Sequence, residues 1–189
     1  KHGMTTMLVT NGTLPKVLEK LDTLPTQLYV SVDAPNKQVF DEVCRPKWGN
    51  GAWDQFEKTI DLLPSLDTRI VCRHTMMKGI NMSSEHIKQF AALDNRADPD
   101  WIEAKGYVYV GHSRENLSME NMPSHEDILN FSNELAPQVD RRVLSESRPS
   151  RVALIGREIV PIPLPDPEMF FPEDLGIAPP TKKLPLIQN

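Results

Sequence analysis

The sequence predicts an α/β protein made of parallel βα units that form an incomplete barrel. Four short apolar runs have the length of strands, and stretches with helical spacing separate them. Polar residues alternate along each run, and successive side chains of a strand point to opposite faces. Because helices connect the strands, we expect both faces of the sheet to be buried. An open four-stranded sheet is the alternative arrangement. The runs are Met7–Asn11, Leu28–Asp33, Thr68–Thr75 and Trp101–Val110.

Helices are predicted in the gaps after the first and second runs. Leu14–Leu24 reads as a helix with Thr13 as its N-cap and Pro15 in its first turn, where proline is favoured. Pro35–Val43 contains a second, shorter helix. The glycines and proline that follow, from Arg45 to Trp53, predict a loop.

Three further helices and one strand complete the expected order of elements. Ala52–Leu63 has apolar residues at helical spacing, and another helix opens after Ser83. Ser124 and Asp127 have the spacing of a capping box at the start of the last helix. Ser150–Gly156 reads as a final strand.

Composition restricts the class of protein. The chain has 189 residues and a net charge of −5, with no apolar stretch long enough to cross a membrane and no signal-peptide pattern. Its two cysteines, Cys44 and Cys72, form neither a disulfide framework nor a CxxC metal site. We therefore expect a cytoplasmic protein without a metal site of its own.

Basic residues cluster locally despite the negative net charge. Five arginines and one acid lie between Arg141 and Arg157. Such patches are the electrostatic mark of phosphate binding, so the sequence permits an RNA partner. Solvated surface arginines are the alternative. Trp48 and Trp53 flank a basic loop, with Trp53 expected in the core.

The two ends of the chain differ from its middle. A strand begins almost at Lys1, which predicts that N-terminal strands of the barrel are missing and that the chain is a fragment or a split gene product. Residues 1–158 are expected to form the partial barrel. Eight of the 17 prolines lie in residues 159–189, which predicts an extended, polyproline-like tail.

A set of strings, in this order along residues 5–157, resembles the 4-demethylwyosine synthases of archaeal type, in their C-terminal portion. Each string is short, and their order and spacing carry the resemblance. The strings are Leu8–Thr13, Thr26–Pro35, Arg45-Pro with Trp53, Lys78–Asn81, Asp100–Gly111, Ser118–Glu126 and Glu146–Leu154.

This resemblance implies a radical S-adenosylmethionine (SAM) lyase with a partial (β/α) TIM-like barrel. Such enzymes act on tRNA-Phe, next to the anticodon, and condense N1-methylguanosine with carbons of pyruvate. They use SAM and [4Fe–4S] clusters, which thiolates hold. The cluster motif CxxxCxxC is absent from this sequence. We therefore expect this chain to be inactive alone and to need the missing segment or a complementary chain.

Polar residues near the ends of neighbouring strands are the candidates for SAM binding. Serine and aspartate oxygens accept hydrogen bonds from ribose hydroxyls or an ammonium group, and an arginine fork suits a carboxylate. An ion pair between Asp33 and Arg73 is the structural alternative. The cofactor candidates are Thr10, Asn11, Ser31, Asp33 and Arg73; no catalytic residue is assigned.

The candidates for tRNA contact are basic residues and an aromatic ring that stacks on a splayed base. Lys105 has two interpretations, since it shares a strand face with Glu103 and pairs either with that residue or with a phosphate. Tyr107 or Tyr109 supplies the ring, whereas His125 at a helix start is expected to be structural. The candidates are Lys47, Lys78, Lys105, Tyr107, Arg114 and Arg151.

Two other functions fit the same residues. One is a different radical SAM enzyme, such as an activase that acts on a protein glycyl radical site. The other is a non-catalytic module for RNA binding or assembly, which the missing cysteines favour.

Overall fold

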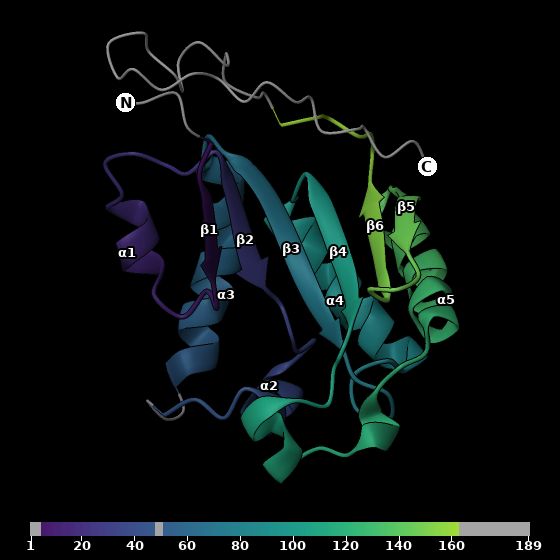
Figure 1. Ribbon diagram of the computed structural model, residues 1–189. Coiled ribbons are helices and arrows are strands. Elements are labelled where there is room, and N and C mark those ends of the chain that lie inside the picture. Colours follow the sequence, from purple (N-terminus) through teal and green to yellow (C-terminus); the bar gives the residue numbers. More distant parts are fainter. Residues whose placement is uncertain (1–4, 48–50, 163–189) are drawn as a thin grey trace, which may run out of the picture. The chain divides into compact units, whose positions relative to one another are not determined.

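A mixed sheet of six strands forms the centre of the fold (Figure 1), in the order β1-β2-β3-β4-β6-β5. The computed structural model describes residues 5–47 and 51–162, of which Met7–Ile159 form one compact unit. β1 to β4 are parallel, and β6 runs antiparallel to both β4 and β5. The strands are β1 (Met7–Thr10), β2 (Gln27–Ser31), β3 (Arg69–Met76), β4 (Trp101–Gly106), β5 (Arg142–Ser147) and β6 (Val152–Gly156).

Five α-helices and several 3-10 turns connect these strands. The α-helices are α1 (Pro15–Glu19), α2 (Lys37–Val43), α3 (Ala52–Leu62), α4 (Ser84–Ala97) and α5 (His125–Leu135). The 3-10 turns are η2 (Leu63–Ser65), η3 (Gly111–Glu115), η4 (Met119–Asn121) and η5 (Ala136–Val139).

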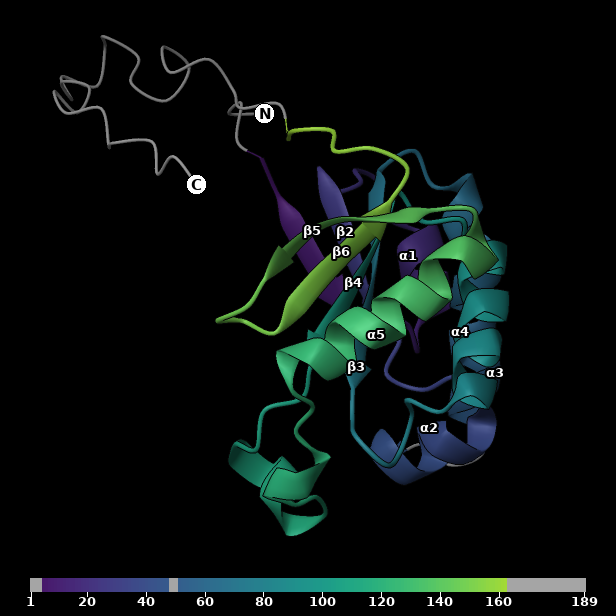
Figure 2. The ribbon, with the colours of Figure 1, turned by 90° about the vertical axis from the view of Figure 1, so that its right-hand side faces the viewer.

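The helices lie on one side of the sheet, and Figure 2 shows α3, α4 and α5 together there. Leu28 and Val30 of β2 and Cys72 of β3 point to this side and are fully buried. On the opposite face, which we call the open face, side chains such as Arg73 and Glu103 are only half-buried. The expectation that both faces are buried holds only in part: all five α-helices pack on the same side, and on the open face Val71 and Trp101 are buried whereas Arg73 and Glu103 are partly exposed.

An aromatic cluster anchors α2 and α3 to this buried side. The ring centroids of Phe40, Trp53 and Phe56 lie 5.3–5.7 Å apart. Burial of one such side chain stabilises a fold by roughly 1.5–3 kcal/mol. The prediction that Trp53 belongs to the core is confirmed, because only 9% of its surface is exposed. Trp48 lies outside the described residues.

One of the two predicted helix caps is confirmed, and Ser83 caps the helix that was expected to open after it. The Ser83 side chain accepts a hydrogen bond from the His86 amide, and Ser124 forms the expected capping box with Asp127. The prediction for Thr13 is wrong. Leu14 is the N-cap of α1, and the Thr13 hydroxyl instead donates to Oδ1 of Asn11 at 2.9 Å.

The structure corrects the C-terminal part of the prediction in two ways. β4 ends at Gly106, four residues before the predicted end, and the Tyr107 amide still donates to the Met76 carbonyl of β3. β5 lies within the predicted basic cluster, where its charge hides its alternation. Arg141, just before β5, is only 8% exposed and donates to Asp98 and to two backbone carbonyls. This arginine is therefore a structural residue.

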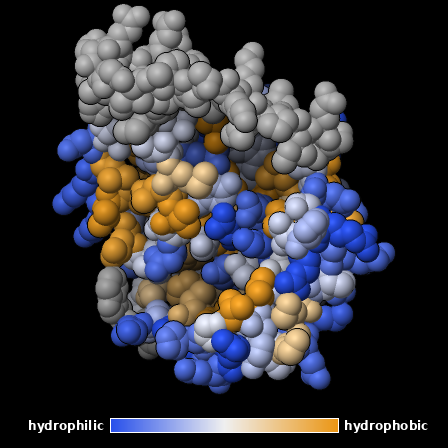
Figure 3. Space-filling view, viewed as in Figure 1, coloured by the Kyte–Doolittle hydropathy of each residue, from blue (hydrophilic) through white to orange (hydrophobic). Residues whose placement is uncertain are grey.

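β1 is the exposed end of the sheet. Met7, Leu8 and Val9 are 37–58% exposed, and Leu14 and Val17 beside them are also exposed. Figure 3 shows these apolar residues gathered over β1 and α1. The predicted division at residue 158 stays a prediction, and most of the proline-rich tail, residues 163–189, lies outside the described residues.

Candidate functional site

A cavity of about 350 Å³ lies at the carboxyl ends of β1 and β2. Three of the five residues predicted to bind cofactor line it: Asn11, Ser31 and Asp33. The carboxyl ends of parallel strands meet at one edge of a sheet, which explains why residues 20 positions apart converge here. The other residues lining the cavity are Thr13, Phe40, Cys44, Arg45, Pro46, Lys47 and Ala52.

The rim formed by β1 depends on a glycine. Gly12 has φ +70°, and a Cβ there would meet the Phe56 ring at 3.2 Å. Its amide donates to the Thr10 hydroxyl at 3.1 Å, and its carbonyl accepts from the Thr59 hydroxyl. Thr10 therefore shapes the turn and does not line the cavity. The turn leaves the Asn11 side chain exposed at the rim.

Asp33 is the carboxylate of this cavity. Its Oδ1 accepts a hydrogen bond from the Thr75 amide at 3.3 Å. Burial raises the pKa of the Asp33 carboxyl, and the hydrogen bonds from Thr75 oppose that shift only in part. A desolvated carboxylate gains most from a cationic or hydroxyl-bearing ligand, because such a ligand returns the interactions that burial removed.

Arg73 pairs with Glu103 on the open face. Its Nε lies 2.8 Å from Oε1 of Glu103, and its guanidinium lies 4.6 Å from the centre of the Tyr29 ring. These contacts correct two alternatives from the sequence. The ion pair of Arg73 is with Glu103 and not with Asp33, and Glu103 therefore does not pair with Lys105.

Lys105 lies two pairs further along the same strands, opposite Thr75 in the register of β3 and β4. Its side chain is half-buried and forms no ion pair with any of the described residues. Burial and the Glu103 carboxylate raise the pKa of the Tyr29 hydroxyl. The open face thus carries a neutralised arginine and a free ammonium group in adjacent positions.

The residues predicted to contact RNA do not form one patch. Lys47 is exposed at the cavity, whereas Arg114 lies 5.8 Å from the Tyr109 ring in a separate excursion after β4. Arg151 donates to the Pro123 carbonyl. Tyr107 is 7% exposed and its hydroxyl lies 2.8 Å from that of Ser113. The Tyr107 ring is therefore not available for stacking in this conformation, while Tyr109 is half-exposed.

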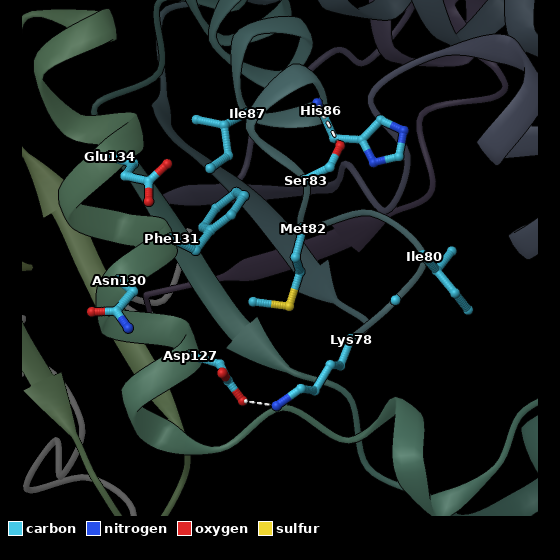
Figure 4. Close-up of a pocket in the computed structure, with 11 residues that line it drawn as sticks. Lys78, Ile80, Met82, Ser83, His86, Ile87, Asp127, Asn130, Phe131 and Glu134 are labelled. Atoms are coloured by element: carbon cyan, nitrogen blue, oxygen red, sulfur yellow. Dashed lines mark hydrogen bonds and ion pairs between the residues drawn. The ribbon is translucent and has the colours of Figure 1, made fainter.

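A second cavity, of about 420 Å³, lies on the helical side between α4 and α5 (Figure 4). At its mouth Nζ of Lys78 donates to Asp127 at 3.0 Å, and Phe131 forms part of its wall. None of the predicted cofactor residues lines this cavity. Lys78, a predicted RNA contact, therefore pairs with the Asp127 carboxylate at this cavity.

The side chains of the described region do not suit an iron–sulfur cluster. Cys72 is fully buried on the helical side, and burial raises the pKa of its thiol. Desolvation and the carboxylates of Asp33 and Asp41 raise the pKa of the Cys44 thiol to about 12. A cluster needs several thiolates. Among the described residues, no group of three or more His, Cys, Asp or Glu side chains gathers for a metal ion, and no helix has the length and apolarity to cross a membrane.

The sequence did not indicate the cavity position of Thr13 or the buried pair of His74 and Asp94. Thr13 was read as a helix cap, and it lines the cavity through its contact with Asn11. His74 and Asp94 form a buried pair, with Nε2 and Oδ1 3.0 Å apart. An apolar-face histidine followed 20 residues later by a helical aspartate gives no local sequence signal. His125, expected to be structural, is 7% exposed and contacts Glu146.

Known proteins resemble this chain both in sequence and in structure. The family model for wyosine base formation matches residues 96–157. The tRNA 4-demethylwyosine synthase of Pyrococcus horikoshii is 43% identical over 164 residues, which are 85% of this chain and 47% of that protein. The chain therefore spans about half the length of the curated archaeal relatives it matches.

Solved structures agree with this assignment. The structure of TYW1 with a lysine–pyruvate adduct bound matches with a TM-score of 0.72 at 35% identity, over 82% of this chain and 48% of that one. A radical SAM methyltransferase from Sphaerobacter thermophilus matches with a TM-score of 0.53 at 17% identity, over 70% of this chain and 37% of that one, and so shows a likeness of fold alone. By sequence and by structure, this chain matches the family of S-adenosyl-L-methionine-dependent tRNA 4-demethylwyosine synthases over about half of their length.

Proposed function

We propose that this chain forms the SAM- and tRNA-facing half of a radical SAM 4-demethylwyosine synthase. The reaction joins N1-methylguanosine of tRNA-Phe, next to the anticodon, to carbons of pyruvate. The observation that carries the proposal is the cavity at the carboxyl ends of β1 and β2, lined by Asn11, Ser31 and Asp33 in a chain that matches this family. The two cysteines, neither in a disulfide, suit a reducing cytoplasm.

The polar set in this cavity fits the polar part of SAM. The Asp33 carboxylate accepts hydrogen bonds from an ammonium group or from ribose hydroxyls, and Ser31 and Asn11 offer both donors and acceptors. Bound SAM supplies a 5′-deoxyadenosyl radical when an iron–sulfur cluster reduces it. The role of these three residues is to bind and orient the cofactor. The Arg73–Glu103 pair lies beside them on the open face.

The fold proposed for the whole protein is a partial barrel. Helices on one face, parallel strands β1 to β4 and an open face with half-buried charges support this proposal. β1 has exposed apolar residues and a free edge, which proteins normally cover. We propose that further parallel strands, supplied by another part of the protein or by a complementary chain, pair with β1 and enclose the open face.

The iron–sulfur cluster requires ligands from outside this sequence. Cys44 and Cys72 lie apart, and their thiols resist ionisation. We therefore derive no chemical step from this chain alone and propose that it is inactive by itself. Its expected contribution to substrate binding comes from Lys47 and Lys105, whose ammonium groups suit a phosphate or carboxylate, and from Tyr109 as a stacking ring.

Anaerobic reconstitution with iron and sulfide tests this proposal. The reconstitution is carried out on the 189-residue chain and on the same chain extended upstream in its reading frame. The readouts are iron content and absorbance near 400 nm. We expect a cluster only in the extended protein. That protein should convert N1-methylguanosine in tRNA-Phe to 4-demethylwyosine when SAM and pyruvate are present, as detected by mass spectrometry of digested tRNA.

Two results would contradict the proposal in different ways. No cluster in either protein rejects the enzymatic function and favours the RNA-binding module. A cluster that cleaves SAM without modifying tRNA rejects the substrate and favours a different radical SAM enzyme. The Asp33→Ala variant of the extended protein should keep its cluster and lose SAM cleavage.

A further inference from the structure

Asn81 is a fully buried polar residue that lies behind the candidate SAM cavity. Its side-chain nitrogen donates to two backbone carbonyls, that of Asp33 at 3.0 Å and that of Thr75 at 2.9 Å. Its side-chain oxygen accepts from the Met77 amide at 2.7 Å. One amide therefore joins the segment that follows β2 to the carboxyl end of β3.

A tight turn brings Asn81 back to the strands it joins. The amides of Ile80 and Asn81 both donate to the Met77 carbonyl, and Gly79 adopts φ +77°, a conformation that favours glycine. Asn121 fixes the outside of this turn. Its backbone carbonyl accepts from the Lys78 amide, and its side chain donates to the Lys78 carbonyl at 3.0 Å. The turn is thus held from both sides.

The bonds of Asn81 form a closed cycle with the cavity carboxylate. Asn81 holds the Asp33 carbonyl and the Thr75 carbonyl, while the Thr75 amide donates to Oδ1 of Asp33. The backbone and the side chain of Asp33 are therefore both fixed relative to β3. A buried amide that loses such partners is left desolvated without compensation, so this arrangement is strongly preferred over a looser one.

We propose that Asn81 is a positioning residue for SAM, acting through Asp33. It does not line the cavity, so its effect on the cofactor is indirect. This inference rests on the proposed function, in that Asp33 must contact SAM. A cofactor contact needs its carboxylate held within a fraction of an ångström, and the Asn81 cycle supplies that constraint.

Two substitutions separate the bonds of Asn81. Asn81→Asp keeps an acceptor for the Met77 amide but cannot donate to the two carbonyls when ionised. Asn81→Ala removes all three bonds and remains usable if the aspartate variant does not fold. Asn95→Asp is the matched control, because Asn95 donates to the Gln138 carbonyl from α4, away from the cavity.

The first readout is amide hydrogen exchange in the 189-residue chain, measured by NMR without ligand. We expect faster exchange at Thr75 in both Asn81 variants, and faster exchange at Met77 in the alanine variant only. The second readout is the dissociation constant for SAM from calorimetry on the upstream-extended protein with its cluster, at a temperature where every variant is folded. We expect it to rise at least fivefold in both Asn81 variants and to stay unchanged in Asn95→Asp.

The two readouts distinguish the ways in which the reasoning can fail. If the upstream-extended wild-type protein binds SAM and the Asn81 variants bind it equally well, the positioning role is overturned and the proposed function stands. If the upstream-extended wild-type protein with its cluster does not bind SAM, the proposed SAM cavity is overturned, and with it the cofactor role of Asn81. Unchanged exchange at Thr75 overturns the hydrogen-bond cycle itself.

Discussion

His74 of β3 and Asp94 of α4 form a buried pair whose loss should cost a large share of the stability of this fold. Their side chains are 0% and 1% exposed, and Nε2 of His74 lies 3.0 Å from Oδ1 of Asp94. The imidazole also stacks on Phe90, with ring centroids 4.5 Å apart. The perturbation we consider is Asp94→Ala, with Asp94→Asn as its near-isosteric control.

The magnitude follows from what each variant leaves behind. Nδ1 of His74 has no partner among the described residues, so Asp94→Ala leaves both ring nitrogens buried and unpaired. Breaking a buried pair in this way costs about 3–5 kcal/mol. Asp94→Asn retains an acceptor oxygen and should cost about 1 kcal/mol. A loss of about 3 kcal/mol corresponds to a melting temperature roughly 6–12 °C lower for a chain of this size.

Urea unfolding measures this difference directly. The buried Trp53 and Trp101 report the transition by fluorescence, and circular dichroism checks that it is a single step. The reasoning is refuted if Asp94→Ala is within about 1 kcal/mol of the wild type, or if Asp94→Asn loses as much as Asp94→Ala. Either result would mean that the hydrogen bond contributes little and that ring stacking alone holds His74.

Three further predictions concern the charged groups and the thiols. Glu103→Gln removes the half-buried ion pair with Arg73, and urea titration should give a free energy of unfolding about 1 kcal/mol lower. Burial raises the pKa of the Asp33 carboxyl, so its ionisation opposes folding, and Asp33→Asn should be more stable than the wild type at pH 7. This difference in stability should shrink as the pH falls through the raised pKa, because the wild-type carboxyl then takes up its proton. Cys72 is buried and Cys44 is exposed, but the pKa of both thiols is raised, that of Cys44 to about 12, so Ellman's reagent at pH 8 should label both slowly in the native chain and rapidly in urea.

Each of these has a clear contrary result. Unchanged stability in Glu103→Gln would mean that solvent already screens the open face. A less stable Asp33→Asn at pH 7 would mean that hydrogen bonds to the carboxylate outweigh its desolvation. Rapid labelling of Cys44 in the native chain would indicate an ionised thiol at the cavity.

The elements of the fold that follow from local periodicity could be predicted from the sequence. β2 and β3 appear close to their expected bounds, because apolar alternation is strong where a helix covers one face. β5 could not be predicted, because it is an edge strand next to β6 with little buried surface and with charged residues that are typical of a loop. Thr13 does not cap α1, because this helix begins one residue later than expected, with Leu14 as its N-cap, and the Thr13 hydroxyl donates to Asn11.

The candidate site was predictable to the extent that it depends on strand ends. Asn11, Ser31 and Asp33 converge because parallel strands share a carboxyl edge. The partner of Arg73 was not predictable, since register decides it: Arg73 lies opposite both Ser31 and Glu103. Asn81 also escaped prediction, because its importance depends on a turn at Gly79 that returns it to two strands.

The two faces of β3 show two ways in which this protein accommodates buried polar and charged side chains. Burying a charge is costly unless it is paired or used, and β3 satisfies this rule on each side by different means. On the helical side, His74 pairs with Asp94 within the core, where burial of both side chains keeps them out of reach of a ligand. On the open side, Arg73 pairs with Glu103, and Asp33, which follows the neighbouring strand β2, lines a cavity. The residue whose polar requirement the fold leaves incomplete is therefore the strongest candidate for contact with the cofactor.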